Sequence, residues 1–191
     1  MRIIGGEFRG RALAAPRGMA IRPTSDRLRE TVFNILAHSH GLPRPETRVL
    51  DLFAGTGALG LEALSRGAAQ ALFVEGGAEA RALIRRNIEA LGLTGRARIF
   101  RRDATRLGDA STMAPFGLVF CDPPYRKGLG EQALASAAAG GWLAPDALCV
   151  LEEASDAEIG CRADFTVLDR RAAGDTQLLF LRWSAPGADV A

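Results

Sequence analysis

"LDLFAGTGALGLEAL", residues 50–64, joins an apolar run to a helical pattern through three closely spaced glycines. Gly55, Gly57 and Gly60 have the spacing G-x-G-x-x-G, which permits a tight turn and a close approach of the backbone to a ligand. Such a turn at the start of a helix presents backbone N–H groups and the positive end of the helix dipole. The stretch therefore predicts a buried strand, a ligand-binding turn and a helix. Alone, it does not distinguish a dinucleotide from another adenosine-containing ligand.

Outward from this stretch, apolar runs alternate with amphipathic helical patterns such as residues 79–93. Alternation of this kind is typical of a mostly parallel sheet covered by helices on both faces. Residues 165–171 and 176–183 are separated by only four residues, which predicts a hairpin containing an antiparallel strand. The expected fold class is therefore α/β and Rossmann-like, with a mostly parallel seven-stranded sheet and an antiparallel C-terminal hairpin strand. The other predicted strands are residues 48–53, 71–75, 97–103, 116–122 and 147–153.

Breaks in the pattern indicate the domain organisation. A chain of 191 residues is long enough to bury a substantial core as one principal domain. Its first residues are basic and rich in glycine, and they predict a short strand pair or arm. A helix capped by Thr24 or Ser25 follows, and "GLPRPE" at residues 41–46 ends it. The predicted parts are an N-terminal basic strand and helix extension (1–45), a principal domain (46–184) and a flexible tail (185–191).

Positive charge is concentrated near the N-terminus. Residues 1–30 hold seven arginines against three acidic residues, although the whole chain has a formal net charge of only +2. An arm more basic than its body suggests a polyanionic partner. A solvated basic surface explains the charge equally well.

The cysteines and histidines do not suggest a metal site. The three cysteines are odd in number and scattered without C-x-x-C spacing, which argues against a disulfide framework and against zinc. His38 and His40 lie near a predicted helix end, where partial charge favours cations. No signal peptide or long apolar span is apparent. We therefore expect a cytoplasmic protein with no membrane insertion and no metal.

Four acidic residues lie near the carboxyl ends of successive predicted strands: Asp51, Glu75, Asp103 and Asp122. Ligands of open α/β sheets bind at the carboxyl edge of the strands, so these side chains are expected to converge on one crevice. Glu75, 20 residues after Gly55, has the spacing of an acid that accepts hydrogen bonds from ribose hydroxyls. Asp51 would repel a pyrophosphate but attract a ligand carrying positive charge.

The ordered motifs "DLFAGTG", "VE", "RRDA" and "DPPY" resemble those of class I S-adenosylmethionine-dependent methyltransferases that modify amino groups. The resemblance implies a Rossmann-like methyltransferase fold, with S-adenosylmethionine as methyl donor and S-adenosylhomocysteine as product. It places Asp51 near the methionine part of the cofactor, Glu75 on the ribose, and Asp103 with Ala104 at the adenine. The implied cofactor-binding residues are Asp51, Phe53, Gly55, Gly57, Glu75, Asp103 and Ala104.

In enzymes of that family, the D-P-P-Y corner receives an exocyclic amine attached to a planar ring. The lone pair of such an amine is delocalised, and hydrogen bonds from its N–H groups to the Asp122 side chain and the Pro123 carbonyl would localise it. Adjacent prolines hold this carbonyl in place, and Tyr125 would stack on the base. The resemblance thus implies that Asp122, Pro123 and Tyr125 are catalytic. Because some relatives have Phe at the last position, the Tyr125 hydroxyl is expected to be dispensable.

The flanking segments narrow the range of possible substrates. "RIIGGEFRGRAL" (2–13), "RPTSDRLRETVFNIL" (22–36) and "GDT" (174–176) resemble the RsmD-like bacterial enzymes. The resemblance implies methylation of guanine N2 in 16S rRNA of a small-subunit particle. Nothing in the sequence demands a dimer, so a monomer is expected. Basic residues near the corner and in the arm would grip phosphates. The expected substrate-binding residues are Arg9, Arg11, Arg22, Thr24, Arg27, Asn34, Arg126 and Lys127.

Three alternatives compete with this interpretation. The same chemistry would serve a DNA adenine or cytosine, or a protein amide. "GTGALG" alone would also suit an NAD-dependent oxidoreductase, but Asp51 and the D-P-P-Y corner disfavour it. A non-catalytic RNA-binding module would explain the basic arm but not the acidic residues that follow the strands.

Overall fold

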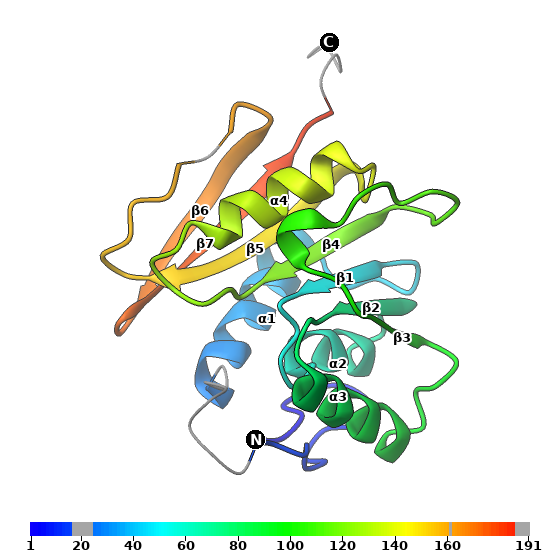
Figure 1. Cartoon of the computed structure of the whole chain (residues 1–191). Coiled ribbons are helices and arrows are strands. Elements are labelled where there is room, and N and C mark those ends of the chain that lie inside the picture. The colour runs from blue at the N-terminus through cyan, green and yellow to red at the C-terminus, as the bar shows by residue number, and fades with distance from the viewer. Residues whose placement is uncertain (17–24, 161, 186–191) are drawn as a thin grey trace. The chain divides into compact units, whose positions relative to one another are not determined.

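The computed structural model describes residues 1–16, 25–160 and 162–185. The chain divides into two compact units, Met1–Arg102 and Asp103–Ala191, each with its own strands and helices (Figure 1). The predicted tail falls outside the described residues apart from Ala185. The predicted division at residue 45 stays a prediction.

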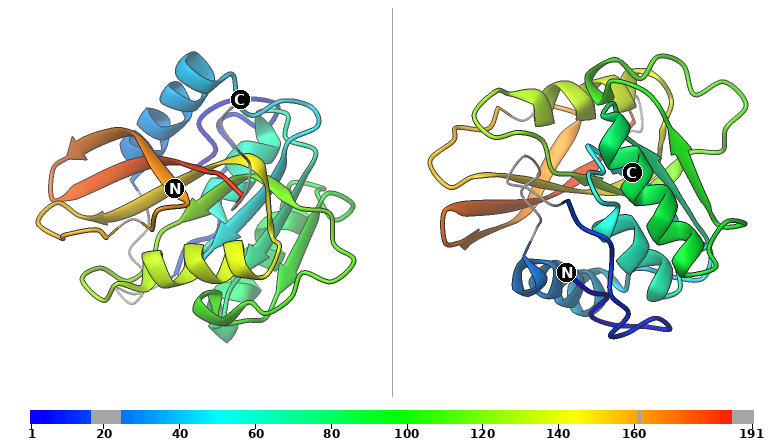
Figure 2. Two further views of the ribbon diagram at one scale, coloured as in Figure 1. Left: turned by 90° about the horizontal axis from the view of Figure 1, so that it is seen from above. Right: turned by 60° about the horizontal axis from the view of Figure 1, so that its bottom comes forward.

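The first unit is built around three parallel strands in the order β3-β2-β1, which are Ala97–Phe100, Gln70–Val74 and Arg48–Leu52. After its first residue each of β1 and β2 is buried throughout, because a parallel strand covered on both faces has no solvent side. Helix α2 (Ala58–Ser65) packs on β1 and β2, and α3 (Ala78–Ala90) packs beside it on β3 (Figures 1 and 2).

Helix α1 (Asp26–His40) also belongs to the first unit. The Ser25 hydroxyl accepts a hydrogen bond from the Leu28 N–H at 3.1 Å, and Gly41 ends the helix in the left-handed conformation (φ 60°). Ser25 is therefore the N-cap, one of the two expected caps. The residues before Pro16 form a loop with one antiparallel bridge, between Arg2 and Ala12, where a short strand pair or arm was predicted.

The second unit has four strands in the order β4-β5-β7-β6. The pair β4–β5 is parallel, and both β5–β7 and β7–β6 are antiparallel, so the predicted hairpin is confirmed. Helix α4 (Leu129–Ala139), which the sequence analysis did not identify, packs against β4, β5 and the 3-10 helix η1 (Ala104–Arg106). The strands are β4 (Phe116–Cys121), β5 (Leu143–Ala154), β6 (Phe165–Ala173) and β7 (Thr176–Trp183).

These elements confirm the predicted fold class of a mostly parallel seven-stranded sheet with an antiparallel C-terminal strand. Two predicted strand boundaries are wrong by three or more residues. The third strand ends at Phe100, so Asp103 lies beyond it, and the fifth begins four residues earlier than predicted, at Leu143. Across the three described segments, no helix is both long enough and apolar enough to cross a membrane.

Candidate functional site

The loop after β1 has an unusual backbone. Phe53, Gly55 and Gly57 adopt positive φ angles of 58°, 56° and 78°. Glycine takes this conformation without penalty, whereas a bulky residue such as phenylalanine takes it at an energetic cost. Strained residues of this kind cluster at ligand-binding sites. The loop is closed by a hydrogen bond from the Gly57 N–H to the Ala54 carbonyl at 2.7 Å, and Gly57 caps α2.

Glu75 connects this loop to the one after β2. Its carboxylate accepts hydrogen bonds from the N–H of Gly55 at 2.9 Å and from the N–H of Gly77 at 2.7 Å. The side chain is half-buried. A carboxylate has about four acceptor sites, so these two bonds leave capacity for ribose hydroxyls, the role expected from the sequence.

Asp51 is buried in β1, where its carboxylate accepts a hydrogen bond from the Gly60 N–H at 2.9 Å. This contact places a carboxylate at the first turn of α2, where the helix dipole favours negative charge. Gly60 itself has a packing role, because a Cβ there would lie 2.4 Å from the Phe73 ring. The third glycine of the motif therefore lets α2 approach the sheet closely.

Asp103 caps the 3-10 helix η1 in the second unit. Its Oδ1 accepts hydrogen bonds from the Thr105 hydroxyl at 2.7 Å and from the Thr105 N–H at 2.9 Å. These bonds, the side-chain one first, lower the pKa of the Asp103 carboxyl, since they stabilise its charged form. Asp103 is exposed and Ala104 is buried. An exposed, ionised carboxylate is suited to accept a further hydrogen bond.

The D-P-P-Y corner begins directly after β4. Asp122 and Tyr125 are half-buried, Pro123 is buried and Pro124 is exposed. The Tyr125 hydroxyl donates a hydrogen bond to the buried Glu152 carboxylate. The corner therefore presents a partly exposed carboxylate and an aromatic ring whose far end is held in the protein.

Arg126 continues the corner with a positive φ of 59°. Its N–H donates to the Glu153 carboxylate at 2.9 Å, and its guanidinium donates two hydrogen bonds to Asp156 at 3.2 and 3.1 Å. The surrounding cavity, of about 310 Å³, is also lined by Glu131, Glu153 and Glu158. These acidic neighbours would repel an RNA phosphate. The expected phosphate contact of Arg126 stays a prediction. Such a contact would compete with the ion pair between Arg126 and Asp156.

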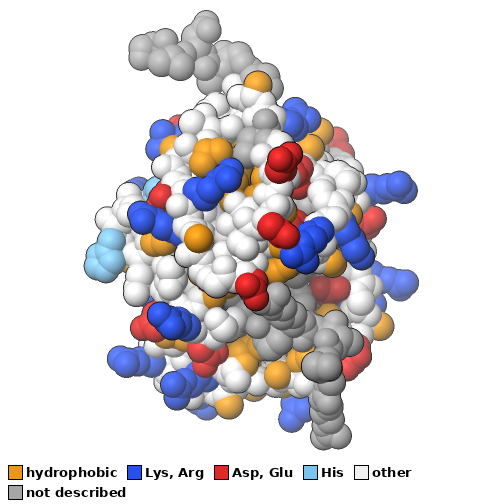
Figure 3. Space-filling model, turned by 90° about the vertical axis from the view of Figure 1, so that its left-hand side faces the viewer, with side chains coloured by type: hydrophobic (Ala, Val, Ile, Leu, Met, Phe, Trp, Pro, Cys, Tyr) orange, Lys and Arg blue, Asp and Glu red, His pale blue; other side chains and the backbone are white. Residues whose placement is uncertain are grey.

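Five of the other expected substrate-binding residues lie at the surface. Basic side chains are interspersed with acidic ones on the face shown in Figure 3 rather than gathered in one patch. Arg22 and Thr24 lie outside the described residues. The exposed ones are Arg9, Arg11, Arg27, Asn34 and Lys127.

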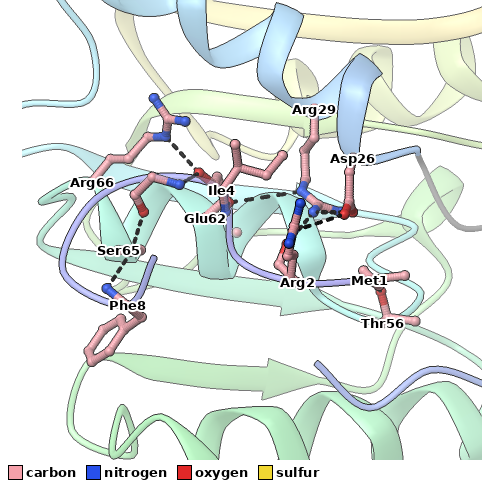
Figure 4. A network of polar contacts seen from close by, with 12 residues as sticks. Met1, Arg2, Ile4, Phe8, Asp26, Arg29, Thr56, Glu62, Ser65 and Arg66 are labelled. Carbon is pink, nitrogen blue, oxygen red and sulfur yellow. Dashed lines mark hydrogen bonds and ion pairs between the residues drawn. The ribbon is translucent and has the colours of Figure 1, made fainter. Parts of the chain in front are cut away.

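Glu62 anchors the N-terminal segment, residues 1–16, to α2 (Figure 4). Its buried carboxylate accepts hydrogen bonds from the N–H groups of Ile4 and Gly5, both at 2.8 Å. Two arginines offset its charge. Arg66 donates at 2.7 Å, and the fully buried Arg29 lies 3.9 Å away. Sequence reasoning counted Arg29 among the surface arginines and missed Glu62. The only available signal was a single acid within the apolar run of α2.

Asn87 links the same segment to the glycine loop. Its buried side-chain amide accepts a hydrogen bond from the Ala14 N–H at 2.7 Å. It donates to the carbonyls of Thr56 at 3.0 Å and Ala14 at 3.2 Å. Because Thr56 lies between Gly55 and Gly57, the side chain of Asn87 supports the candidate cofactor loop. The sequence analysis did not identify this residue.

Among the residues that the structure describes, no cluster of three or more His, Cys, Asp or Glu side chains could hold a metal ion. The residues expected at the site comprise a glycine loop and two carboxylates, Asp51 and Glu75, in the first unit, and Asp103 and the D-P-P-Y corner in the second. The family model described as Conserved hypothetical protein 95 matches residues 1–182. The chain belongs to this family.

Similar proteins agree with this family assignment. Ribosomal RNA small subunit methyltransferase D of Escherichia coli K12 is 43% identical over 152 residues, which cover 80% of this chain and 74% of the relative. The protein of the same name from Haemophilus influenzae is 33% identical over 177 residues, 91% of this chain and 89% of its own. A solved structure of yhhF from Escherichia coli, described as a candidate methyltransferase, has a TM-score of 0.81 and 36% identity, covering 97% of this chain and 98% of that one.

Proposed function

We propose that this protein transfers a methyl group from S-adenosylmethionine to the exocyclic N2 amine of a guanine in 16S rRNA of the small ribosomal subunit. The observation that carries the proposal is the D-P-P-Y corner at the end of β4, in a chain whose family relatives are named small-subunit rRNA methyltransferases. The substrate would place the enzyme in the bacterial cytoplasm, and we propose that it acts as a monomer.

The residues of the glycine loop suit this cofactor. S-adenosylmethionine supplies an electrophilic methyl group on a positively charged sulfonium. We propose that Asp51 lies on the side of the methionine part, that Phe53, Gly55 and Gly57 line the cofactor, and that Glu75 accepts hydrogen bonds from the ribose. Asp103 and Ala104 would contact the adenine. The acceptor capacity of Glu75 and Asp103, and the strained Phe53 backbone, support this assignment.

The corner would activate the target amine. The guanine N–H groups would donate hydrogen bonds to the Asp122 carboxylate and the Pro123 carbonyl, which draws the nitrogen lone pair towards the methyl group. The two prolines restrict the backbone, so this carbonyl needs little reorganisation during transfer. The Tyr125 ring would stack on the base and align it with the methyl carbon.

An RNA target agrees with the exposed arginines of the N-terminal segment. Arg9 and Arg11 would contact phosphates, whereas a single-stranded loop would offer a base that is easily turned into the corner. A base in a duplex must first be flipped, at a cost of a few kcal/mol.

The direct test uses S-adenosylmethionine with a labelled methyl group. Small subunits from cells lacking the enzyme, naked 16S rRNA and duplex DNA are each incubated with the protein, and the labelled nucleoside is identified after digestion. We expect N2-methylguanosine from the subunits. Label in DNA or in protein would overturn the RNA assignment, and label in naked rRNA alone would overturn the particle as substrate.

The role of Asp122 gives a sharper prediction. Asp122→Ala is expected to lower kcat by about 100-fold or more, because an acceptor aligned with the transition state is lost. The dissociation constant for S-adenosylmethionine, measured by calorimetry, should change less than about twofold, since the proposed cofactor contacts are elsewhere. Glu131→Ala, a half-buried acid in α4, is the control. Retained transfer in Asp122→Ala would exclude the assigned role.

A further inference from the structure

The pairing of β5 with β7 places two polar side chains together on one face of the sheet. In the β5–β7 pairing, Glu152 lies opposite Leu178 and Ala154 lies opposite Thr176. Side chains two residues apart on a strand share a face, so Glu152 and Thr176 are diagonal neighbours. Both are buried, with 6% and 3% of their surface exposed. Polar groups this deeply buried need partners.

The partner that they share is the tyrosine of the corner. Cys121, the last residue of β4, pairs with Leu151, so the corner starts beside Glu152. The Tyr125 hydroxyl donates to Glu152 and lies 3.2 Å from the Thr176 hydroxyl. A phenol has one proton, and Glu152 accepts it, so Thr176 is the donor in the second bond.

The backbone next to the tyrosine is held separately. Glu153 accepts from the N–H of Arg126 at 2.9 Å and from its neighbour Ala154 at 2.7 Å. Consecutive strand residues point to opposite faces of a sheet, so the Glu152 and Glu153 side chains leave β5 in opposite directions. They bind different groups of the corner. One anchors the ring through its hydroxyl, and the other anchors the main chain.

We propose that Glu152 and Thr176 are positioning residues for methyl transfer, which set the orientation of the Tyr125 ring by holding its hydroxyl. The inference rests on the proposed function, in which this ring stacks on the target base. It assigns the G-D-T segment, whose Thr176 begins β7, a role at the catalytic corner. It also opposes the expectation that the hydroxyl is dispensable in this chain. The ring is half-buried, and the two bonds add to the packing that restrains its orientation.

The ionisation of Tyr125 reports on these contacts. Burial, followed by the hydrogen bond to Glu152, raises the pKa of the Tyr125 phenol well above its usual value, whereas the bond from Thr176 lowers it. The hydroxyl therefore stays protonated near neutral pH and can donate throughout an activity assay. Tyr125 is also the only tyrosine in the chain, so tyrosinate absorbance measures this one residue.

The first test is a double-mutant cycle in methyl transfer to small subunits. Tyr125→Phe removes one oxygen and is expected to lower kcat about tenfold, because slight misplacement of reacting groups slows transfer. Glu152→Gln should lower kcat by a smaller factor. Both should leave the calorimetric affinity for S-adenosylmethionine within about twofold of the wild type. If Glu152 acts through the hydroxyl, the double variant is no slower than Tyr125→Phe.

Two kinetic results would overturn the proposal. One is an unchanged kcat in Tyr125→Phe, and the other is a double variant whose loss equals the product of the single losses. Rates are expressed per S-adenosylmethionine-binding site, so unfolded protein does not enter the comparison. Glu158→Gln, an exposed acid lining the cavity beside the corner, is the matched control and should leave kcat unchanged.

The second test is a titration of tyrosinate absorbance, with circular dichroism recording the folded fraction. The wild-type phenol should ionise above about pH 10, the usual value. Glu152→Gln should lower this pKa and Thr176→Val should raise it, whereas Glu158→Gln should leave it unchanged. A Glu152→Gln titration identical to the wild type would refute the network itself. If the titrations shift as expected but the wild type transfers no methyl to RNA, the network stands and the proposed function fails.

Discussion

At the scale of single residues, the Thr105 hydroxyl stabilises the charged form of a candidate cofactor ligand, Asp103. Its bond to Asp103 is the largest cause of the lowered pKa of that carboxyl. A carboxyl with a depressed pKa in the folded protein stabilises the fold above its unfolded pKa of about 3.9. That contribution is lost as the pH falls through the folded pKa.

We therefore predict that Thr105→Val raises the pKa of the Asp103 carboxyl. The variant should melt at a lower temperature than the wild type at pH 7, and the difference should shrink on acidification below about pH 4. Carboxyl NMR and thermal melts across this range measure both effects. Thr94→Val, at an exposed turn, is the control. A melting difference that persists unchanged in acid would assign the loss to packing rather than to the hydrogen bond.

The predictability of individual site residues depends on the sequence distance to their partners. The glycines, Glu75 and the corner belong to short motifs, so sequence reasoning identified them. Glu62 and Asn87 act on backbone groups 58 and 73 residues away. No local sequence pattern indicates partners this far away, so neither residue was predicted. Thr176 belonged to a recognised motif, but its contact with Tyr125 required the register of β5 and β7.

At the scale of elements, the close fit of the N-terminal segment to α2 depends on one glycine. Gly6 has φ +78°, and a Cβ there would lie 1.9 Å from the Ser65 carbonyl oxygen. Gly10 has a similar φ of +84°, but a Cβ there would meet nothing within 4 Å. The two positions therefore differ in steric contact and share the same backbone strain.

This pair predicts different stabilities for the two alanine variants. Gly10→Ala should lower the free energy of unfolding by about 1–2 kcal/mol, the cost of a left-handed alanine. Gly6→Ala should cost at least about 2 kcal/mol more, because the segment must move away from α2. Urea denaturation of the purified variants measures both values. Equal losses would mean that the Ser65 contact relaxes without cost.

The elements themselves were largely predictable, and their ends were not. Buried apolar runs identified the covered parallel strands β1, β2 and β4, because such strands have no polar alternation to obscure them. The mostly exposed β6 was predicted instead from its short connection to β7. The boundaries depend on pairing, which is why β3 ends at Phe100, where its ladder with Val74 ends. Helix α4 was missed because its sequence, "LGEQALASAAA", is dominated by small residues with little contrast between its faces.

At the scale of the whole molecule, the net charge is only +2, although residues 1–30 carry an excess of arginines. These N-terminal arginines are proposed to bind RNA. Binding through phosphates releases counterions, and on single strands each contact contributes about 0.7 to the slope of log affinity against log salt. Replacing both Arg9 and Arg11 with Glu should therefore weaken binding to small subunits and reduce this slope by about 1–2.

The salt titration is compared with calorimetric binding of S-adenosylmethionine, which this double variant should leave unchanged. A variant with Glu at Arg98 and Arg101, two exposed arginines outside the N-terminal segment, is the matched control. An equal loss of affinity in both variants would show that RNA is held by diffuse positive charge rather than by the N-terminal arginines.

The sequence resolved the family at this scale, and its division of the chain into domains stays a prediction. It predicted a boundary at residue 45, because a proline-rich break lies there. The contacts group residues 1–102 together, since the N-terminal segment bonds to α2 and α3. Such grouping arises from long-range hydrogen bonds, which composition does not reveal.

Glu62 binds the N-terminal segment through the N–H groups of Ile4 and Gly5, not through their side chains. Recognition of this kind does not depend on the Ile4 side chain, although a Cβ at Gly5 would lie 2.6 Å from the Arg66 guanidinium. The residue at position 4 is therefore expected to vary during evolution, whereas Glu62 is needed whichever side chain occupies that position. Related genes should record this asymmetry as a variable residue facing an unvarying acid.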